Sequence, residues 1–224
     1  MLPVVILARL SHRDVDKNYL LGKFDPALDS RFVKPDDRYA SGAAQRQFLR
    51  KEAYEAFVKM AEDAIKDNIE LAIVSATRNF DAQKAIWERK WMKLSTIVSR
   101  IERAREILKY SAMPGTSRHH WGTDIDLNNL EDEYFLSGKG WEVYQWLTAN
   151  AAKYGFCQPY TPKASGRAGY EEEKWHWSYT PLSTPLLRQY LNTVTLADIT
   201  DFQGSEIAAE LDVIKNYVAG VDCQ

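Results

Sequence analysis

The chain of 224 residues has little cysteine, little histidine and no long apolar run. Its two cysteines, Cys157 and Cys223, do not belong to a Cys-x-x-Cys pair, which excludes a zinc site built from cysteine knuckles. They form either one disulfide in an oxidising compartment or two buried thiols. No apolar segment reaches the roughly 18 to 20 residues that a membrane-spanning helix needs. We expect a first strand at residues 2–8 rather than a secretory signal.

An excess of charge of one sign is also missing. Lys and Arg number 29 against 31 Asp and Glu, which gives a net charge of -2. This balance excludes a broad basic surface for nucleic acid or anionic lipid, so we expect a small or neutral partner. Hydrophobic residues make up 45% of the chain, enough for a substantial core. We expect one domain over residues 1–224, with an N-terminal extension (1–44) and C-terminal helices (180–224) packed on it.

The spacing of apolar residues predicts helices and strands in irregular order. Helices are expected over residues 45–68, 83–107 (capped by Asp81 and interrupted near Ser95), 141–154 (ending at Gly155), 186–192 and 205–218. Strands are expected over residues 70–75, 122–128, 156–160 and 175–179. This pattern predicts an α+β fold, in which helices pack on a small and mostly antiparallel sheet.

Two of the expected strands place polar side chains on one face. In residues 122–128, Ile125 and Leu127 lie on one side, and Asp124 and Asp126 lie on the other. In the last strand the aromatic residues point toward the core and His176 points away from it. The sheet is therefore expected to carry carboxylate and imidazole groups on its face away from the core.

Three of the four histidines occur in this strand and in the stretch SRHHWGTDID at residues 117–126. Zinc favours imidazole and carboxylate ligands, and a catalytic zinc keeps three protein ligands and one open position for water. His119, Asp126 and His176 would make such a set. Glu173, three residues before His176, would supply the base that takes a proton from the water. His120 is not expected to be a ligand, and His12 is expected to lie in a solvated loop.

The motifs Ser117-x-His119-x-x-Gly122-x-x-x-Asp126 and Glu173-x-Trp175-His176 follow one another in this chain. Together they resemble the zinc D-alanyl-D-alanine carboxypeptidases and dipeptidases of the VanY and VanX type (peptidase family M15), relatives of some phage endolysins and of the hedgehog signalling domain. A third element, Ser75-Ala76-Thr77-Arg78 with Gln83, is similar to the family's strand exit with an arginine and a glutamine. The three elements lie within residues 75–179, in the order found in the family.

The resemblance implies roles for the matched residues. His119, Asp126 and His176 match the ligands of one zinc ion per chain. Glu173 matches the base that deprotonates the zinc-bound water and later passes the proton to the leaving amine.

The resemblance also implies a substrate. Arg78 matches the arginine that holds the substrate and offsets the oxyanion, although a surface ion pair is the alternative. Ser117 and Gln83 match residues that bind the peptide end, and Ser117 could instead cap the turn. The implied activity removes a terminal D-alanine from peptidoglycan stem peptides, in the periplasm or on the outer cell surface. The alternatives are an endopeptidase that cuts within the stem or cross-bridge, as endolysins do, and a binding module with a structural zinc.

The sequence departs from the family pattern at three places. Asp124 stands where the family usually has a small residue, often Ala. We expect its carboxylate to bond the free ring nitrogen of a zinc-binding histidine, and the alternative is a bond to a neighbouring amide or Arg only. Lys174 stands where relatives often have Pro. Because Glu171 and Glu172 precede Glu173, the choice of Glu173 as the base rests on spacing alone.

Overall fold

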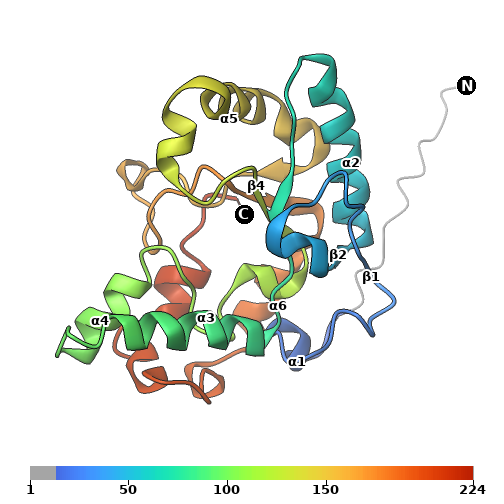
Figure 1. The fold of residues 1–224 in the computed structure, drawn as a ribbon. Coiled ribbons are helices and arrows are strands. Elements are labelled where there is room, and N and C mark those ends of the chain that lie inside the picture. Colours follow the sequence, from blue (N-terminus) through green and yellow to red (C-terminus); the bar gives the residue numbers. More distant parts are fainter. Residues whose placement is uncertain (1–13, 224) are drawn as a thin grey trace, which may run out of the picture.

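A four-stranded antiparallel sheet lies at the centre of the computed structural model, which describes residues 14–223 (Figure 1). The expected strand at residues 2–8 and His12 lie outside the described residues. The strand order is β3 (Ile73–Ser75), β4 (Asp124–Leu127), β6 (His176–Tyr179) and β5 (Phe156–Cys157). A separate antiparallel pair joins β1 (Phe32–Val33) to β2 (Leu49–Arg50). The expected α+β fold with a small antiparallel sheet is confirmed.

Helices surround this sheet. They are α1 (Lys17–Leu20), α2 (Lys51–Lys66), α3 (Phe80–Lys93), α4 (Arg100–Ile107), α5 (Gly138–Asn150) and α6 (Thr180–Thr193). In Figure 1, α5 and α2 lie above and to the right of the sheet, and α3 and α4 lie below it. Within residues 14–223, none of the helices has both the length and the apolar character needed to cross a membrane.

One face of the sheet is apolar and packs against α2 and α5. The buried cluster there includes Phe57, Ile125, Leu127, Leu147 and Trp177. A second buried cluster joins α1, α3, α4, α6 and the C-terminal segment. The alternation expected in β4 and β6 is confirmed, because their apolar positions belong to the first cluster and the positions between them carry buried polar side chains.

The helix expected over residues 45–68 begins later than its apolar spacing predicted. Leu49 and Arg50 form β2, paired with Val33 and Phe32, and α2 starts only at Lys51. Leu49 is fully buried in this strand. An apolar residue at helical spacing is therefore used by a strand that pairs with Phe32–Val33, outside the expected helix, and local periodicity does not contain that information.

Two further predictions about helices are wrong in detail. The cap of α3 is Asn79, whose side chain accepts a hydrogen bond from the Ala82 amide, and Asp81 lies in the first turn. Asn79 has the extended backbone that a cap requires. The helix expected at 205–218 is two short pieces, Ser205–Ala208 and Ile214–Val218, because Asp212 adopts a positive φ of 45°.

Other expectations about helices are confirmed. The expected interruption near Ser95 separates α3 from α4. The turn after α5 ends at Gly155, as expected for a left-handed cap, with φ of 83°. The last long helix, α6, is longer than predicted and starts at Thr180, because Pro181 fits a first turn, where no amide donor is needed.

Candidate metal centre and active site

The sheet register brings two of the expected ligands together. Asp126 of β4 lies opposite His176 of β6 and also pairs with Ser75 of β3. His119 arrives from a short 3-10 helix, Arg118–Trp121, which ends at Gly122 in the left-handed conformation, just before β4. An added Cβ at Gly122 would lie 2.3 Å from the Phe32 ring. This tight turn therefore needs glycine, and it directs His119 toward the polar face of the sheet.

The side chains of His119, Asp126 and His176 converge. One possible ligand atom from each lies within 4.8 Å of the other two, and all three residues are buried. The Oδ1 atom of Asp126 lies 3.3 Å from Nε2 of His119 and 3.1 Å from Nδ1 of His176. The three residues expected to bind a metal therefore do lie together.

The hydrogen bonds of the two imidazoles fit a bound cation. Nδ1 of His119 lies 2.8 Å from the carbonyl oxygen of Ala76, and Nε2 of His176 lies 2.9 Å from Oδ2 of Asp124. Because both partners only accept, these nitrogens carry the protons, and in neutral imidazoles the other two nitrogens are acceptors. Those acceptors face Oδ1 of Asp126, which is buried without a hydrogen-bond partner. Three converging acceptors are unfavourable alone and match the donor set of a transition-metal ion.

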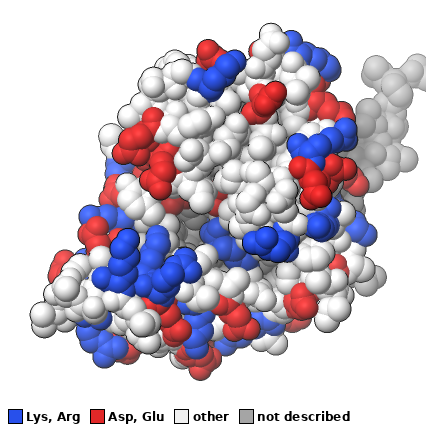
Figure 2. Space-filling view, viewed as in Figure 1, with Lys and Arg blue, Asp and Glu red and all other residues white. Residues whose placement is uncertain are grey.

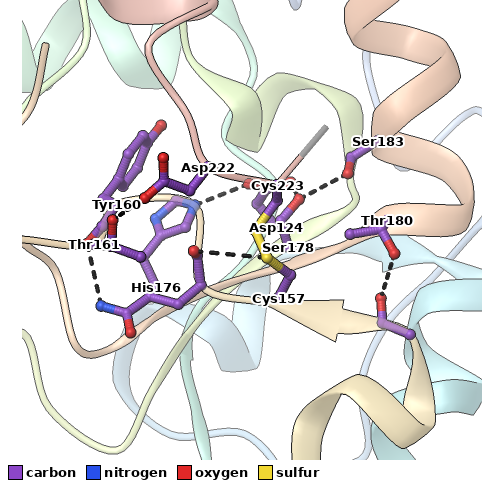
Figure 3. Close-up of a disulfide and its surroundings, with 12 residues drawn as sticks. Asp124, Cys157, Tyr160, Thr161, His176, Ser178, Thr180, Ser183, Asp222 and Cys223 are labelled. Atoms are coloured by element: carbon purple, nitrogen blue, oxygen red, sulfur yellow. Dashed lines mark hydrogen bonds and ion pairs between the residues drawn. A yellow bond between two sulfur atoms is a disulfide. The ribbon is translucent and has the colours of Figure 1, made fainter. Parts of the chain in front are cut away.

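Asp124 lies at the centre of a buried polar network behind His176 (Figure 3). Besides His176, its carboxylate accepts hydrogen bonds from Arg118 Nε at 3.0 Å, Ser178 Oγ at 2.9 Å and Thr123 Oγ1 at 2.7 Å. Burial alone would raise the pKa of Asp124, but Arg118 and His176 lower it below its ordinary value. Asp124 is therefore an ionised acceptor, and the expected bond to a candidate ligand, His176, is present in addition to a bond from Arg118.

The sequence did not single out Arg118 as a site residue. Its side chain is only 1% exposed, and its Nη2 donates to Ser178 Oγ at 2.6 Å. Ser178 could have been found, because strand alternation places it on the same face as His176. Arg118 had no such signal, since it occupies a position between Ser117 and His119 where the motif allows any residue.

Of the three consecutive glutamates, only Glu173 faces the candidate metal centre. It is 6% exposed, and its Oε2 lies 3.4 Å from Nδ1 of His176. Glu172 instead pairs with Lys174 at 2.7 Å, and Glu171 pairs with Lys163 at 2.6 Å. Burial raises the pKa of the Glu173 carboxyl. A carboxylate in this environment suits proton transfer near neutral pH.

Arg78 follows the end of β3 by three residues and lies beside the same centre. Its Nη1 lies 3.5 Å from Oδ2 of Asp126 and donates to Ser75 Oγ at 2.5 Å. Its Nε donates to Oε1 of Gln83 at 3.0 Å, and Gln83 in turn donates to the Ala112 carbonyl at 2.8 Å. Both ends of the Gln83 amide are therefore bonded to the protein. Gln83 is placed to orient Arg78, and the contact with the peptide end that the resemblance implied stays a prediction.

A cavity of about 650 Å³ opens beside these residues. Its wall includes all of the expected site residues except Asp124, which lies behind His176; they are Arg78, Gln83, Ser117, His119, Asp126, Glu173 and His176. Ser117 is 4% exposed, and its side chain makes no capping hydrogen bond to the turn. In Figure 2, Lys and Arg side chains border a hollow in this face of the molecule.

Two tyrosines in the cavity wall were not predicted from the sequence. The ring of Tyr160 lies 4.7 Å from that of His176 and 4.9 Å from that of Tyr170. Both are buried, and burial raises the pKa of both hydroxyls above the ordinary value. They close one side of the cavity with neutral aromatic surface. No spacing in the sequence relates them to the histidine motifs.

Both ring nitrogens of His120, which was not expected to be a ligand, have backbone partners. Its Nδ1 lies 2.6 Å from the Arg78 carbonyl, and its Nε2 accepts from the Gly115 amide at 3.0 Å. Burial lowers the pKa of His120 to about 3, so the ring is neutral. It ties the histidine turn to the strand exit that carries Arg78.

Cys157 and Cys223 form a disulfide, which decides between the two alternatives left by the sequence. Figure 3 shows this bond next to the Asp124 network. Cys157 of β5 lies opposite Ser178 of β6. The disulfide therefore links the C-terminal segment to the edge strand beside the network.

Known proteins are similar to this chain in sequence. A family model described as VanY, D-alanyl-D-alanine carboxypeptidase, matches residues 46–182. YodJ of Bacillus subtilis (strain 168) is 31% identical over 169 residues, which cover 74% of this chain and 58% of YodJ. A D-alanyl-D-alanine carboxypeptidase of Enterococcus faecalis (strain ATCC 700802 / V583) is 29% identical over 136 residues, covering 57% of this chain and 49% of that protein. The chain spans about half the length of the curated relatives it matches.

Two solved structures share the fold of this chain. The structure of LdcB, described as an LD-carboxypeptidase, has a TM-score of 0.57 at 27% identity and covers 79% of this chain and 78% of that chain. A zinc complex of the D,D-pentapeptidase VanY, at 22% identity, shares the fold with a TM-score of 0.52 over 68% of this chain and 86% of that chain. The family match covers more than half of the sequence and includes every residue of the site described above, so the chain belongs to the VanY family of D-alanyl-D-alanine carboxypeptidases.

Proposed function

We propose that this protein is a zinc-dependent carboxypeptidase that removes the terminal D-alanine from peptidoglycan stem peptides. The observation that carries the proposal is the convergence of three buried acceptor atoms, from His119, Asp126 and His176, beside the buried carboxylate of Glu173. Zinc suits two imidazoles and one carboxylate and leaves a position for water. The zinc-bound VanY relative and the family assignment support the same metal and substrate class.

The chain's own residues divide the chemistry between them. When bound, zinc lowers the pKa of a water molecule to about 7 and polarises a carbonyl group. Glu173 takes the proton from the attacking water and passes it to the amine that leaves. Arg78, held by Ser75 and Gln83, places a cation where negative charge develops on the carbonyl oxygen. A donor in such a position contributes roughly 3 to 4 kcal/mol to transition-state stabilisation.

The compartment follows from the substrate and the disulfide. Peptidoglycan lies outside the cytoplasmic membrane, and the Cys157–Cys223 bond is typical of proteins in oxidising compartments. We therefore place the enzyme in the periplasm or at the outer cell surface.

The proposal is tested by incubating the zinc-loaded protein with defined pentapeptide and tetrapeptide stems and weighing the products by mass spectrometry. We expect loss of one terminal alanine from at least one stem, and no loss with Glu173→Gln. Preference for the tetrapeptide would indicate the L,D activity described for LdcB. Products cut within the stem or the cross-bridge would instead indicate an endopeptidase. No cleavage of any stem would favour a binding module.

A further inference from the structure

Lys90 is a partly buried cation in the cavity wall without a carboxylate partner among the described residues. It lies on α3 and faces the cavity together with Gln83 and Ile86, which are seven and four residues earlier in the helix. Its Nζ donates to the neutral hydroxyl of Ser111 at 2.6 Å. Burial lowers the pKa of Lys90, and the negative charges of Glu173 and Glu131 oppose this shift. An anionic ligand would supply the missing counter-charge.

Arg78, which also lines the cavity, has different partners from Lys90. It bonds Ser75 and Gln83 and lies 3.5 Å from the candidate ligand Asp126. It is therefore beside the atoms that would hold the metal, where the oxyanion develops. Lys90 lies further along the same wall and is free to hold a second negative charge of the substrate.

One part of the cavity wall is acidic. Residues 131–133, Glu-Asp-Glu, line it, and Glu131 and Glu133 are exposed. An anionic group of a ligand is repelled there and attracted to the side that carries Lys90.

We infer that Lys90 binds the free C-terminal carboxylate of the substrate and thereby selects peptides that are cut one residue from their end. This inference rests on the proposed function and names the specificity residue of the same site. One terminal residue spans only about 3.3 to 3.6 Å, so its carboxylate has to meet a cation close to the general base. Lys90 and Glu173 line the same cavity, which fits this requirement. An endopeptidase would have no use for such a cation at this place.

The test compares two substrates that differ only at their end, a stem peptide with a free D-alanine carboxylate and its C-terminal amide. Both cleavage and binding are measured, with binding followed by calorimetry on the Glu173→Gln background. We expect the zinc-loaded protein to prefer the free acid, and Lys90→Met to lower kcat/KM and affinity for the acid on the order of 10- to 100-fold while hardly changing either value for the amide. Lys90→Arg, which keeps the charge, should retain most of the preference.

Lys93→Met is the matched control, because Lys93 is an exposed lysine of the same helix outside the cavity wall. It should leave kcat/KM and affinity unchanged for both substrates.

An equal fall of these values for the acid and the amide in Lys90→Met would overturn the inference, since it would mean that Lys90 serves Glu173 or the fold. Equal use of both substrates by the unmodified protein would overturn it as well, while the hydrolase activity would stand. Acid-specific binding that depends on Lys90 without any cleavage would support the inference and contradict the proposed function. Binding of neither peptide would overturn both.

Discussion

Glu173 differs from the two glutamates before it in what its carboxylate faces. It lies beside His176 in the cavity, whereas Glu172 is paired with Lys174 and Tyr144. Glu173→Gln should therefore keep the metal but lower turnover by a factor on the order of 100 to 10,000, the usual contribution of a positioned general base. Glu172→Gln is the control, and its metal content and turnover should stay close to those of the unmodified protein. Elemental analysis and steady-state kinetics on both variants check this, and the reverse pattern would assign the base to Glu172.

The Asp124 carboxylate links a candidate metal ligand to a buried Arg. Because Asp124 accepts from Nε2 of His176, Asp124→Ala should free the ring and lower zinc affinity about 10- to 100-fold. It also leaves Arg118 buried without its carboxylate partner, which should reduce the free energy of unfolding by about 3 to 5 kcal/mol.

The two effects of Asp124→Ala are measured separately, zinc affinity by competition with a chelator and stability by urea denaturation of the metal-free protein. Ser178→Ala is the control for affinity, because it removes one partner of Asp124 and keeps the bond to His176. Unchanged zinc affinity in Asp124→Ala would show that this carboxylate serves Arg118 and the fold alone.

The positions of individual site residues could be predicted from the sequence wherever a motif or a strand alternation fixed the direction of a side chain. Asp126 and His176 lie together because β4 and β6 pair in the register that places them opposite each other, and the turn at Gly122 brings His119 to them. The partners of these residues were not predictable, because Arg118 and Tyr160 reach the site through tertiary packing. The roles of the expected site residues in metal binding and catalysis stay predictions.

Among the elements, α3 carries Gln83 and Lys90 into the cavity wall, and its start is fixed by Asn79. Asn79→Ala removes the side-chain acceptor for the Ala82 amide and should lower the free energy of unfolding by about 1 kcal/mol. Asp81→Ala is the control, with an expected loss of about 0.3 to 1 kcal/mol from its interaction with the helix dipole. Urea denaturation of both variants checks the order. A larger loss in Asp81→Ala than in Asn79→Ala would contradict the observed cap.

Periodic patterns predicted the existence of the elements better than their limits. The alternation in β4 and β6 and the break between α3 and α4 followed from local sequence. The start of α2 did not, because β2 exists only through its pairing with β1. The division of the last expected helix depends on a single backbone conformation at Asp212, which apolar spacing does not encode.

For the whole molecule, the Cys157–Cys223 disulfide closes a long loop with a sequence separation of 66 residues. It ties the C-terminal segment to β5 beside the Asp124 network (Figure 3). Replacing both cysteines by serine should lower the free energy of unfolding by about 2 to 4 kcal/mol. Urea denaturation of the variant and of the unmodified protein, each with and without a reductant, checks this. Sensitivity to reductant should disappear in the variant, and equal stability of the oxidised and reduced unmodified protein would contradict the prediction.

We propose that one zinc ion, held by His119, Asp126 and His176, makes this chain a carboxypeptidase. The most direct measurement is a titration of the metal-free protein with zinc while the release of terminal D-alanine from a stem peptide is followed. We expect release to be absent without metal, to rise in proportion to added zinc and to level off at one ion per chain, and His176→Ala to bind little zinc and to stay inactive. Release of D-alanine by the metal-free protein, or stoichiometric zinc retained in His176→Ala, would contradict the account.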